Sequence, residues 1–237
     1  MPNENYLAPG GKEYTLTAGQ LAGLNKKSKV LDIACGHGAA SLNLARKFGC
    51  RATAIDIEES FIAEGAALAK KEKLDKLINF IAGDFNKQKF NAASFDMIIA
   101  EGGALSYIGR GPGLKRAHRL LKKNGYIEIS DLILRGKTVS REIKDIFLSG
   151  LNNLDLETEE SYRTLLKING FEIVFCSYIA RQYWEMYYEN IKRNLKNRRG
   201  FFSDKNVRAA FNKEIRFFYK RRDLDQIGYL FIVAKKR

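Results

Sequence analysis

Apolar runs and segments of helical periodicity alternate along most of the chain. Four short apolar runs each predict a strand, at residues 30–33, 52–56, 77–82 and 96–100, and the stretch 122–130 leads into a fifth. Between them, apolar side chains recur every three or four positions, as at Ala40, Leu44 and Phe48, which predicts helices. Strands that alternate with helices predict βαβ units and a parallel sheet.

The C-terminal third continues this pattern. Residues 140–151 have apolar side chains at helical spacing, and Thr158, followed by two glutamates, favours the start of a further helix. Gly170 favours the end of that helix, because glycine adopts the left-handed cap conformation readily. Residues 171–180 and 229–234 predict two more strands, so the whole chain is expected to form a seven-stranded α/β domain.

Residues 181–225 lie between the last two predicted strands and predict two amphipathic helices. One apolar stripe consists of Trp184, Tyr187, Tyr188, Ile191 and Leu195, and the other of Val207, Phe211, Ile215 and Phe218. Helices of this kind bury one face. We therefore expect the stripes to pack on each other and on the sheet, and a lid or a dimer contact is the alternative.

Composition sets the broad class of the protein. The chain has 237 residues, of which 45% are hydrophobic and 29% charged, as expected for one globular domain over residues 1–237. No apolar run approaches the roughly 18 residues of a spanning helix, and no signal segment opens the sequence, so we expect a cytoplasmic protein without a membrane partner. The three cysteines lack a C-x-x-C motif and there are only two histidines, so no metal site is expected.

A glycine-rich turn follows the first predicted strand. Gly36-His37-Gly38 separates the run 30–33 from the first helical segment. A strand, a glycine turn and a helix form the nucleotide-binding half of a βαβ unit, because the turn lets the backbone approach a ligand and the helix directs its N–H groups at it. A dinucleotide fingerprint needs a third glycine, but Ser41 stands there. A tight turn without a ligand is the alternative interpretation.

An acid closes the second predicted strand. Asp56 follows Gly36 by 20 residues, the distance at which a carboxylate on the neighbouring strand reaches the ribose of a nucleoside. Several nucleoside cofactors satisfy this geometry, so Asp56 indicates a nucleoside without naming it. The alternative is that Asp56 only caps the helix that starts near Ser60.

Four motifs follow one another at the ends of the predicted strands. They are D-x-x-x-G-x-G at 32–38, G-D-F at 83–85, S-F-D-M-I at 94–98 and the stretch 122–130, which is similar to an L-K-P-G-G signature. In this order they resemble the motifs of the class I S-adenosylmethionine-dependent methyltransferases. Ala34 stands where many members of that family have glycine, which fits provided that its φ is negative, and Asn124 replaces a proline.

The resemblance implies the fold. It implies a Rossmann-like, seven-stranded, mostly parallel sheet with helices on both faces, in which the last strand runs antiparallel between strands five and six. It also implies that the segment 1–28 folds over the cofactor and that residues 181–225 form an insertion between strands six and seven. Tyr14 and Thr17 then either face the site or lie on the surface of a helix.

The resemblance also implies a cofactor site for S-adenosylmethionine. Its expected contacts are Asp32, Ala34, Cys35, Gly36, Gly38, Asp56, Ile57, Gly83, Asp84, Phe85, Glu101 and Gly102. In the family, the acid at Asp32 lies near the amino end of the methionine moiety. The acid at Asp84 meets the adenine amino group, and the side chain at Phe85 lies against the ring.

The expected catalytic residues lie beside the methyl group. Glu101 and Tyr107 follow the fourth strand, where the family places residues next to the transferred methyl, and Glu101 is the candidate base. We expect His37 to contact the cofactor or solvent. Cys35 is not expected to be a nucleophile, because no basic partner is apparent nearby.

The predicted activity is methyl transfer to a small molecule by a monomer or homodimer, and the sequence does not identify the acceptor. From Arg181 onward there are 16 basic and 6 acidic side chains, so an RNA methyltransferase is the alternative. Against it, no Asn/Asp-Pro-Pro-Tyr follows the fourth strand and no cysteine stands where a C5 base methyltransferase needs its nucleophile. A protein that binds the cofactor without catalysis is a third hypothesis.

Overall fold

The structure, a computed structural model, describes residues 6–136, 138–147, 156–220 and 225–237. Its centre is a seven-stranded sheet with the order β3-β2-β1-β4-β5-β7-β6. The strands are β1 (Lys29–Ile33), β2 (Arg51–Asp56), β3 (Ile78–Ala82), β4 (Phe95–Ala100), β5 (Leu121–Leu134), β6 (Phe171–Tyr178) and β7 (Ile227–Lys236). β7 runs antiparallel between β5 and β6, and the other strand pairs are parallel, which confirms the predicted fold.

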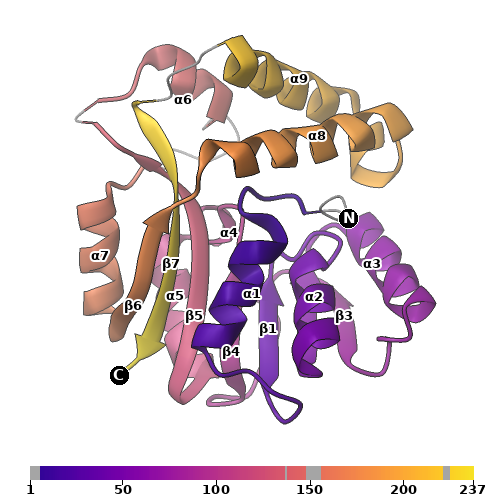
Figure 1. Ribbon diagram of the computed structural model, residues 1–237, viewed down its shortest axis with the longest axis vertical. Coiled ribbons are helices and arrows are strands. Elements are labelled where there is room, and N and C mark those ends of the chain that lie inside the picture. Colours follow the sequence, from indigo (N-terminus) through magenta and orange to yellow (C-terminus); the bar gives the residue numbers. More distant parts are fainter. Residues whose placement is uncertain (1–5, 137, 148–155, 221–224) are drawn as a thin grey trace.

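Helices cover both faces of the sheet (Figure 1). One face carries α1 (Gly11–Leu21), α2 (Ala39–Phe48) and α3 (Glu59–Lys71), and the other carries α4 (Ala104–Ile108), α5 (Arg110–Leu120) and α7 (Glu159–Ile168). Leu44 of α2 and Leu114 of α5 are completely buried. The core therefore forms two layers, one on each face, because the strands of a parallel sheet need cover on both sides.

The ends of α7 match the sequence prediction. Thr158 Oγ1 accepts a hydrogen bond from Ser161 N–H at 3.1 Å, and Ser161 Oγ accepts one from Thr158 N–H at 2.9 Å, which is a reciprocal capping box. Gly170 follows the helix with a φ of +81°. The helix predicted over 140–151 is observed as α6 (Arg141–Phe147), and its predicted last turn lies outside the described residues.

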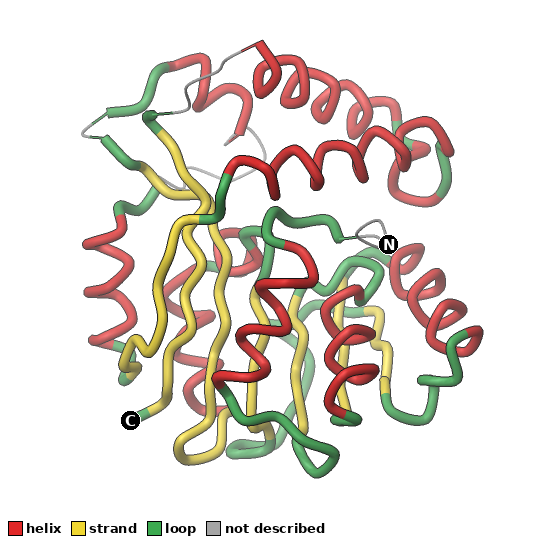
Figure 2. Tube along the Cα trace, viewed as in Figure 1, coloured by secondary structure: helices red, strands yellow, loops and turns green. Residues whose placement is uncertain are grey.

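A further helical layer lies across the carboxyl ends of the strands (Figures 1 and 2). It consists of α8 (Arg181–Asn197), the 3-10 helix η1 (Gly200–Ser203) and α9 (Lys205–Lys220), and we call it the roof. The Trp184 indole stacks on the Phe218 ring with centroids 5.8 Å apart, and the Tyr188 ring lies 4.6 Å from the same phenyl ring. The two apolar stripes therefore pack on each other, as predicted.

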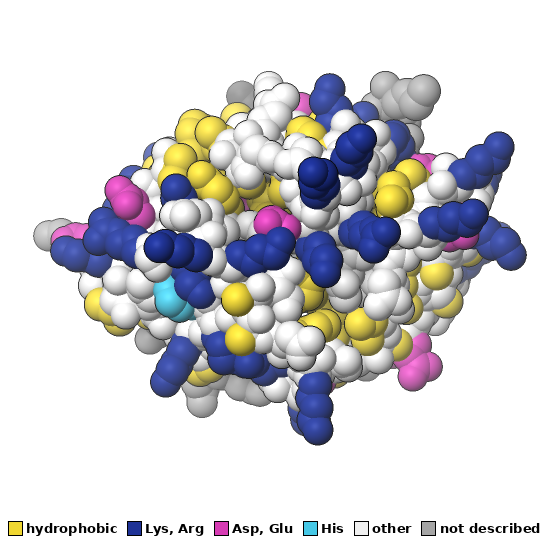
Figure 3. Space-filling model, turned by 90° about the horizontal axis from the view of Figure 1, so that it is seen from below, with side chains coloured by type: hydrophobic (Ala, Val, Ile, Leu, Met, Phe, Trp, Pro, Cys, Tyr) yellow, Lys and Arg dark blue, Asp and Glu magenta, His cyan; other side chains and the backbone are white. Residues whose placement is uncertain are grey.

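One face of the molecule carries many basic side chains. Lysine and arginine side chains are spread over the face opposite the roof (Figure 3). Within the described ranges, no helix combines the length and the apolar composition that crossing a bilayer requires.

Candidate active site

One cavity of about 810 Å³ opens at the carboxyl ends of β1, β2 and β4, beneath the roof. The strand order reverses between β1 and β4, and ligands of open α/β sheets bind beside such a point. The predicted site residues that line the cavity are Asp32, Ala34, Cys35, Gly36, Asp56, Ile57, Gly83, Asp84, Phe85, Glu101, Gly102 and Tyr107. The carboxylates at 32, 56 and 84 thus share one edge of the cavity, which we call the rim.

The turn after β1 begins in a left-handed conformation. Ala34 has a φ of +53°, so the condition of a negative φ, under which alanine would fit this position without strain, is not met. The chain turns directly at the end of β1, because Cys35 N–H donates to the carbonyl of Ile55 on the neighbouring strand at 3.1 Å. The strand therefore passes into the turn without an intervening extended residue.

The two glycines of the turn serve different contacts. Gly36 lines the cavity, and a Cβ there would lie 3.0 Å from Leu7 Cδ1. Gly38 lies outside the lining, and a Cβ there would lie 2.6 Å from the Phe80 ring. Gly38 therefore lets the turn pack closely on β3.

Asp32 is buried beneath the turn and is held by α2. Its Oδ2 accepts hydrogen bonds from the Ser41 hydroxyl at 2.8 Å and from the Ser41 N–H at 3.2 Å. Burial raises the pKa of Asp32 to about 7. Ser41, which stands in place of the third glycine of a dinucleotide motif, was not predicted to have a role, although a hydroxyl in the first turn of the helix is well placed to donate to an acid on the strand.

Asp56 ties the glycine turn to β2. Its Oδ2 accepts a hydrogen bond from Gly36 N–H at 2.8 Å, and its Oδ1 accepts one from Glu58 N–H at 2.9 Å. The cap of α3 is Glu58, whose carboxylate accepts from Ser60 N–H at 3.3 Å. The alternative that Asp56 only caps this helix is therefore wrong. Each carboxylate oxygen has a second lone pair, so Asp56 keeps acceptor capacity for hydroxyl groups in the cavity.

The loop after β3 supplies Asp84 and Phe85. Asp84 Oδ1 accepts a hydrogen bond from Asn86 N–H at 2.8 Å, which holds the carboxylate at the rim. The Phe85 ring is buried, and the Arg116 guanidinium lies over it at 4.8 Å, so the protein itself covers one ring face. Ile57 also lines the cavity and is 76% exposed, which makes it the more accessible apolar surface for a base.

Glu101 follows β4 and faces α1. Its Oε1 accepts a hydrogen bond from Thr15 Oγ1 at 2.5 Å. Burial, together with the nearby Asp32 carboxylate, raises the pKa of Glu101 to about 8. Glu128 of β5 is completely buried beside it, and burial and the charge of Glu101 raise its pKa as well. Three carboxyl groups thus lie together, and no described lysine or arginine forms an ion pair with them.

α1 reaches the site through Thr15. Tyr14 packs edge-on against Tyr183 with ring centroids 5.1 Å apart, and the Thr17 hydroxyl donates within its own helix. Neither Tyr14 nor Thr17 lines the cavity, whereas residues 6–8 do. The segment ahead of α1 therefore contributes to the cavity wall.

The other end of the cavity, which we call the chamber, is aromatic. Its side chains come from α4, β7 and the roof, and they include Tyr107, Trp184, Tyr187, Tyr188, Glu214 and Tyr229. Burial raises the pKa of Glu214 to about 7, and its Oε1 accepts a hydrogen bond from Tyr188 OH at 2.7 Å. Tyr107 was the one member of this set predicted as a site residue, and the aromatic residues of α8 were predicted as packing positions.

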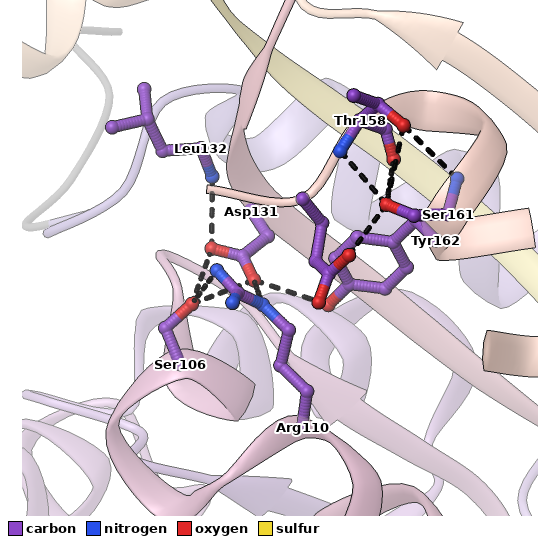
Figure 4. A network of polar contacts seen from close by, with 8 residues as sticks. Ser106, Arg110, Asp131, Leu132, Thr158, Ser161 and Tyr162 are labelled. Atoms are coloured by element: carbon purple, nitrogen blue, oxygen red, sulfur yellow. Dashed lines mark hydrogen bonds and ion pairs between the residues drawn. The ribbon is translucent and has the colours of Figure 1, made fainter. Parts of the chain in front are cut away.

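A network of buried polar groups borders the chamber (Figure 4). Asp131 Oδ2 accepts hydrogen bonds from Arg110 Nε at 3.1 Å, from Ser106 Oγ at 2.8 Å and from Tyr162 OH at 3.1 Å. Asp131 and Arg110 are only 2% and 5% exposed, so this ion pair is fixed and neutral overall. The network was not predicted, although Asp131 has the same signal as Asp56: an acid directly after an apolar run.

Comparison with known proteins decides the family. Residues 30–125 match the family model described as a methyltransferase domain, and all predicted cofactor contacts fall within this segment. This segment is therefore a methyltransferase domain, of the kind found in class I S-adenosylmethionine-dependent methyltransferases.

Named relatives are similar over most of this methyltransferase. Phosphoethanolamine N-methyltransferase 1 from Arabidopsis thaliana is 28% identical over 202 residues, which cover 85% of this chain and 40% of the relative. Sarcosine/dimethylglycine N-methyltransferase from Halorhodospira halochloris is 26% identical over 180 residues, which cover 75% of this chain and 63% of the relative. The methyltransferase thus spans about half the length of these curated relatives.

Solved structures share its fold. The crystal structure of MccD protein has a TM-score of 0.74 at 24% identity and covers 98% of this chain and 100% of that one. Phosphoethanolamine N-methyltransferase 2 from Haemonchus contortus, in complex with S-adenosyl-L-methionine, has a TM-score of 0.77 at 21% identity, with coverage of 98% and 54%. The likeness therefore extends beyond the segment 30–125 to the whole sheet and its helices.

The rim suits S-adenosylmethionine, the cofactor of this family. That molecule has a sulfonium and an ammonium group, both cationic. Asp32 is buried and Glu101 is half-buried, both have raised pKa values, and neither has a cationic partner among the described residues. A buried carboxylate is stable only beside an opposite charge or several donors. A cationic ligand at the rim would therefore supply what these two side chains lack.

Two residues of the turn of the methyltransferase have other roles. His37 Nε2 pairs with Glu64 Oε2 at 3.0 Å, and its ring packs edge-on against Phe61. His37 is buried and does not line the cavity, and its contact with the cofactor or solvent stays a prediction. Cys35 lines the cavity, but burial raises the pKa of its thiol well above the usual value, which does not favour a nucleophilic thiolate.

Proposed function

We propose that the protein transfers a methyl group from S-adenosylmethionine to a small molecule held in the chamber. One cavity joins the acidic rim to the aromatic chamber, and this observation supports the proposal. Glu101 lies near Asp32 at the rim, and a Cβ at Gly103 would lie 3.9 Å from Tyr229 OH in the chamber, so this stretch connects the two ends. A cofactor at the rim and an acceptor in the chamber would meet there, under a roof that excludes water.

Each end of the cavity has its own task in this proposal. The cofactor supplies an electrophilic methyl group on a sulfonium. Asp56 and Asp84 hold the nucleoside, and Asp32 holds the cationic methionine end. Glu101 orients the attacking atom or removes its proton, and Tyr107 positions the acceptor by a hydrogen bond.

A small molecule fits the chamber better than RNA does. The described lining contains no lysine, and its one arginine, Arg110, is paired with Asp131. RNA binding needs cations close to the site to neutralise phosphates. The relatives named after phosphoethanolamine and sarcosine also support a small acceptor.

Two measurements test the proposal. Calorimetric titration with S-adenosylmethionine and S-adenosylhomocysteine should show binding of both, and labelled cofactor should transfer its methyl group to members of a small-molecule panel. Binding without transfer to any acceptor would indicate a non-catalytic protein. Transfer to total RNA in place of small molecules would contradict the proposed acceptor class.

Glu101→Gln sharpens the test. The amide retains an acceptor for Thr15 but cannot remove a proton, so turnover should fall by roughly 100-fold while the affinity for S-adenosylhomocysteine changes little. Glu13→Gln, on the exposed side of α1, is the control and should preserve turnover. Equal losses of binding and turnover in Glu101→Gln would assign the side chain a positional role.

A further inference from the structure

Glu214 of α9 is a carboxyl group that lines the chamber and has no cationic partner among the described residues. Its recorded hydrogen bond comes from Tyr188 OH at 2.7 Å, and no described lysine, arginine or histidine forms an ion pair with it. Burial raises its pKa to about 7, against the lowering effect of that bond. A desolvated carboxylate with one hydrogen bond is costly unless a ligand supplies the opposite charge.

Aromatic side chains surround this carboxyl group. Burial raises the pKa of the phenols of Tyr187 and Tyr229, and the nearby charge of Glu214 raises them further. Tyr107 also lines the cavity, and its side chain is 70% exposed. The rings of Tyr187 and Tyr188 lie 4.8 Å apart. An acid among aromatic rings is an arrangement that binds organic cations, because the face of each ring is electron-rich.

Among the described residues, the rest of the chamber offers no anchor for an anion. Arg110 donates from Nε to Asp131 at 3.1 Å and from a terminal nitrogen to Ser106 at 2.7 Å. A phosphate or carboxylate in the chamber would meet the carboxyl groups of Asp131 and Glu214 and a guanidinium that is already paired. The chamber therefore discriminates by repulsion of anions as well as by attraction of cations.

We propose that the chamber binds its small molecule through a cationic amine, protonated or quaternary, held by Glu214 and the ring faces of Tyr107, Tyr187 and Tyr229. The inference rests on the proposed function, since the amine belongs to the methyl acceptor. A preference for a cationic amine also distinguishes this chain from the relative named after phosphoethanolamine. The phosphate of phosphoethanolamine would have no counterion in the described lining of the chamber.

Matched ligands test the inference on the full chain saturated with S-adenosylhomocysteine. The panel consists of alkyl and benzyl ammonium compounds, from primary to quaternary, each paired with an uncharged isostere, such as choline with 3,3-dimethylbutan-1-ol. Phosphocholine adds an anion to the same cation. At least one cation should bind about tenfold more tightly than its isostere, which is 1.4 kcal/mol. Equal affinities throughout, or tighter binding of phosphocholine than of choline, would overturn the inference.

Glu214→Gln isolates the charge. The amide still accepts from Tyr188, so cation and isostere should bind within about twofold of each other, whereas the affinity for S-adenosylhomocysteine should stay unchanged. Glu185→Gln on the exposed face of α8 is the matched control and should keep the preference for cations. If Glu214→Gln does not fold, Tyr187→Leu removes a ring face instead and should weaken cation binding about fivefold.

The two proposals fail in different ways. Binding of S-adenosylhomocysteine reports on the rim, and the preference for cations reports on the chamber. Absence of the first contradicts the proposed function. Absence of the second, with the first intact, contradicts only the cationic acceptor. A preference for cations that persists in Glu214→Gln also contradicts the role assigned to this carboxylate.

Discussion

The rim and the chamber are two ends of one cavity that the chain builds in different ways. At the rim, Asp32 and Asp56 end neighbouring parallel strands, so the order of the strands alone brings them to a common edge. In the chamber, Tyr107 of α4 meets Glu214 of α9 only because the roof folds back over the sheet. The rim depends on local turns after strands, whereas the chamber depends on the packing of elements far apart in the sequence.

The two ends also differ in how their buried charges are balanced. The chamber has one compensated acid, Asp131, with Arg110 beside it, and one acid, Glu214, that lacks a cationic partner in the described part of the chain. At the rim, Asp32 and Glu101 have no cationic partner among the described residues. Compensated charges fix the structure, and uncompensated ones are the groups that a cationic ligand can satisfy.

The largest expected effect concerns the compensated pair of the chamber. Asp131→Ala leaves the buried Arg110 guanidinium without its carboxylate, and breaking a buried ion pair in this way costs about 3–5 kcal/mol. Urea denaturation should show this decrease in the free energy of unfolding. Tyr162→Phe removes one hydrogen bond to the same carboxylate and should cost about 1 kcal/mol. Equal losses in the two variants would show that the ion pair does not dominate the network.

The next effect concerns the rim. Asp56→Ala should weaken the binding of S-adenosylmethionine by about 1–3 kcal/mol, because it removes a charged acceptor from the cavity. Asp56→Asn keeps an acceptor oxygen for Gly36 N–H, so it should lose less, and the difference separates ligand binding from support of the turn. Asp75→Ala, in the exposed loop after α3, is the control for calorimetry. Unchanged affinity in Asp56→Ala would remove Asp56 from the proposed ribose contact.

The sequence predicts the rim of the cavity better than the chamber. Acids and glycines directly after apolar runs were enough to place Asp32, Asp56 and Asp84 at one edge, because parallel strands end together. Side-chain direction and backbone torsion within the turn were not predictable from spacing, so the φ of Ala34 and the contact of His37 with Glu64 were missed.

At the chamber, helical periodicity indicates burial but not what the buried face meets. Trp184 and Phe218 pack on each other as predicted, yet Trp184 also lines the cavity. Glu214 stands three residues after Phe211, a spacing that places a charge on the apolar stripe of α9. That charge on an otherwise apolar face was the available signal for the chamber.

The buried carboxyl groups of the rim and of the chamber should both make the folded protein less stable as pH rises. In the folded protein the pKa values of Asp32, Glu101 and Glu214 are raised to about 7, 8 and 7 by burial. Between pH 5 and 8 the folded state therefore binds more protons than the unfolded state, so stability falls as pH rises. The melting temperature of the ligand-free protein should fall by several degrees over this range, since 1 kcal/mol corresponds to about 2–4 °C at this chain length.

The melting temperature of the protein with bound S-adenosylmethionine tests whether a cation compensates the carboxylates of the rim. A cation at the rim favours ionised Asp32 and Glu101, so S-adenosylmethionine should raise the melting temperature more at pH 8 than at pH 5. Glu101→Gln should flatten the dependence of the ligand-free protein on pH. A melting temperature that is constant or rises from pH 5 to 8 would contradict the raised pKa values.

The smallest expected effect concerns the turn at the rim. Ala34 has a φ of +53°, a conformation that costs a residue with a Cβ about 1 kcal/mol relative to glycine. Glycine loses part of that advantage through the larger entropy of the unfolded chain. Ala34→Gly should therefore raise the free energy of unfolding by about 0.5 kcal/mol in urea denaturation.

Ala93→Gly is the matched variant, because Ala93 has a φ of +50° in an exposed turn before β4 and does not line the cavity. Both variants should gain similar stability, but only Ala34→Gly should bind S-adenosylhomocysteine more weakly, since a more flexible turn has to be ordered on binding. A loss of stability in Ala34→Gly together with a gain in Ala93→Gly would mean that the Ala34 methyl group packs against its neighbours. In that case the packing of the Ala34 methyl group offsets the strain of its left-handed backbone conformation.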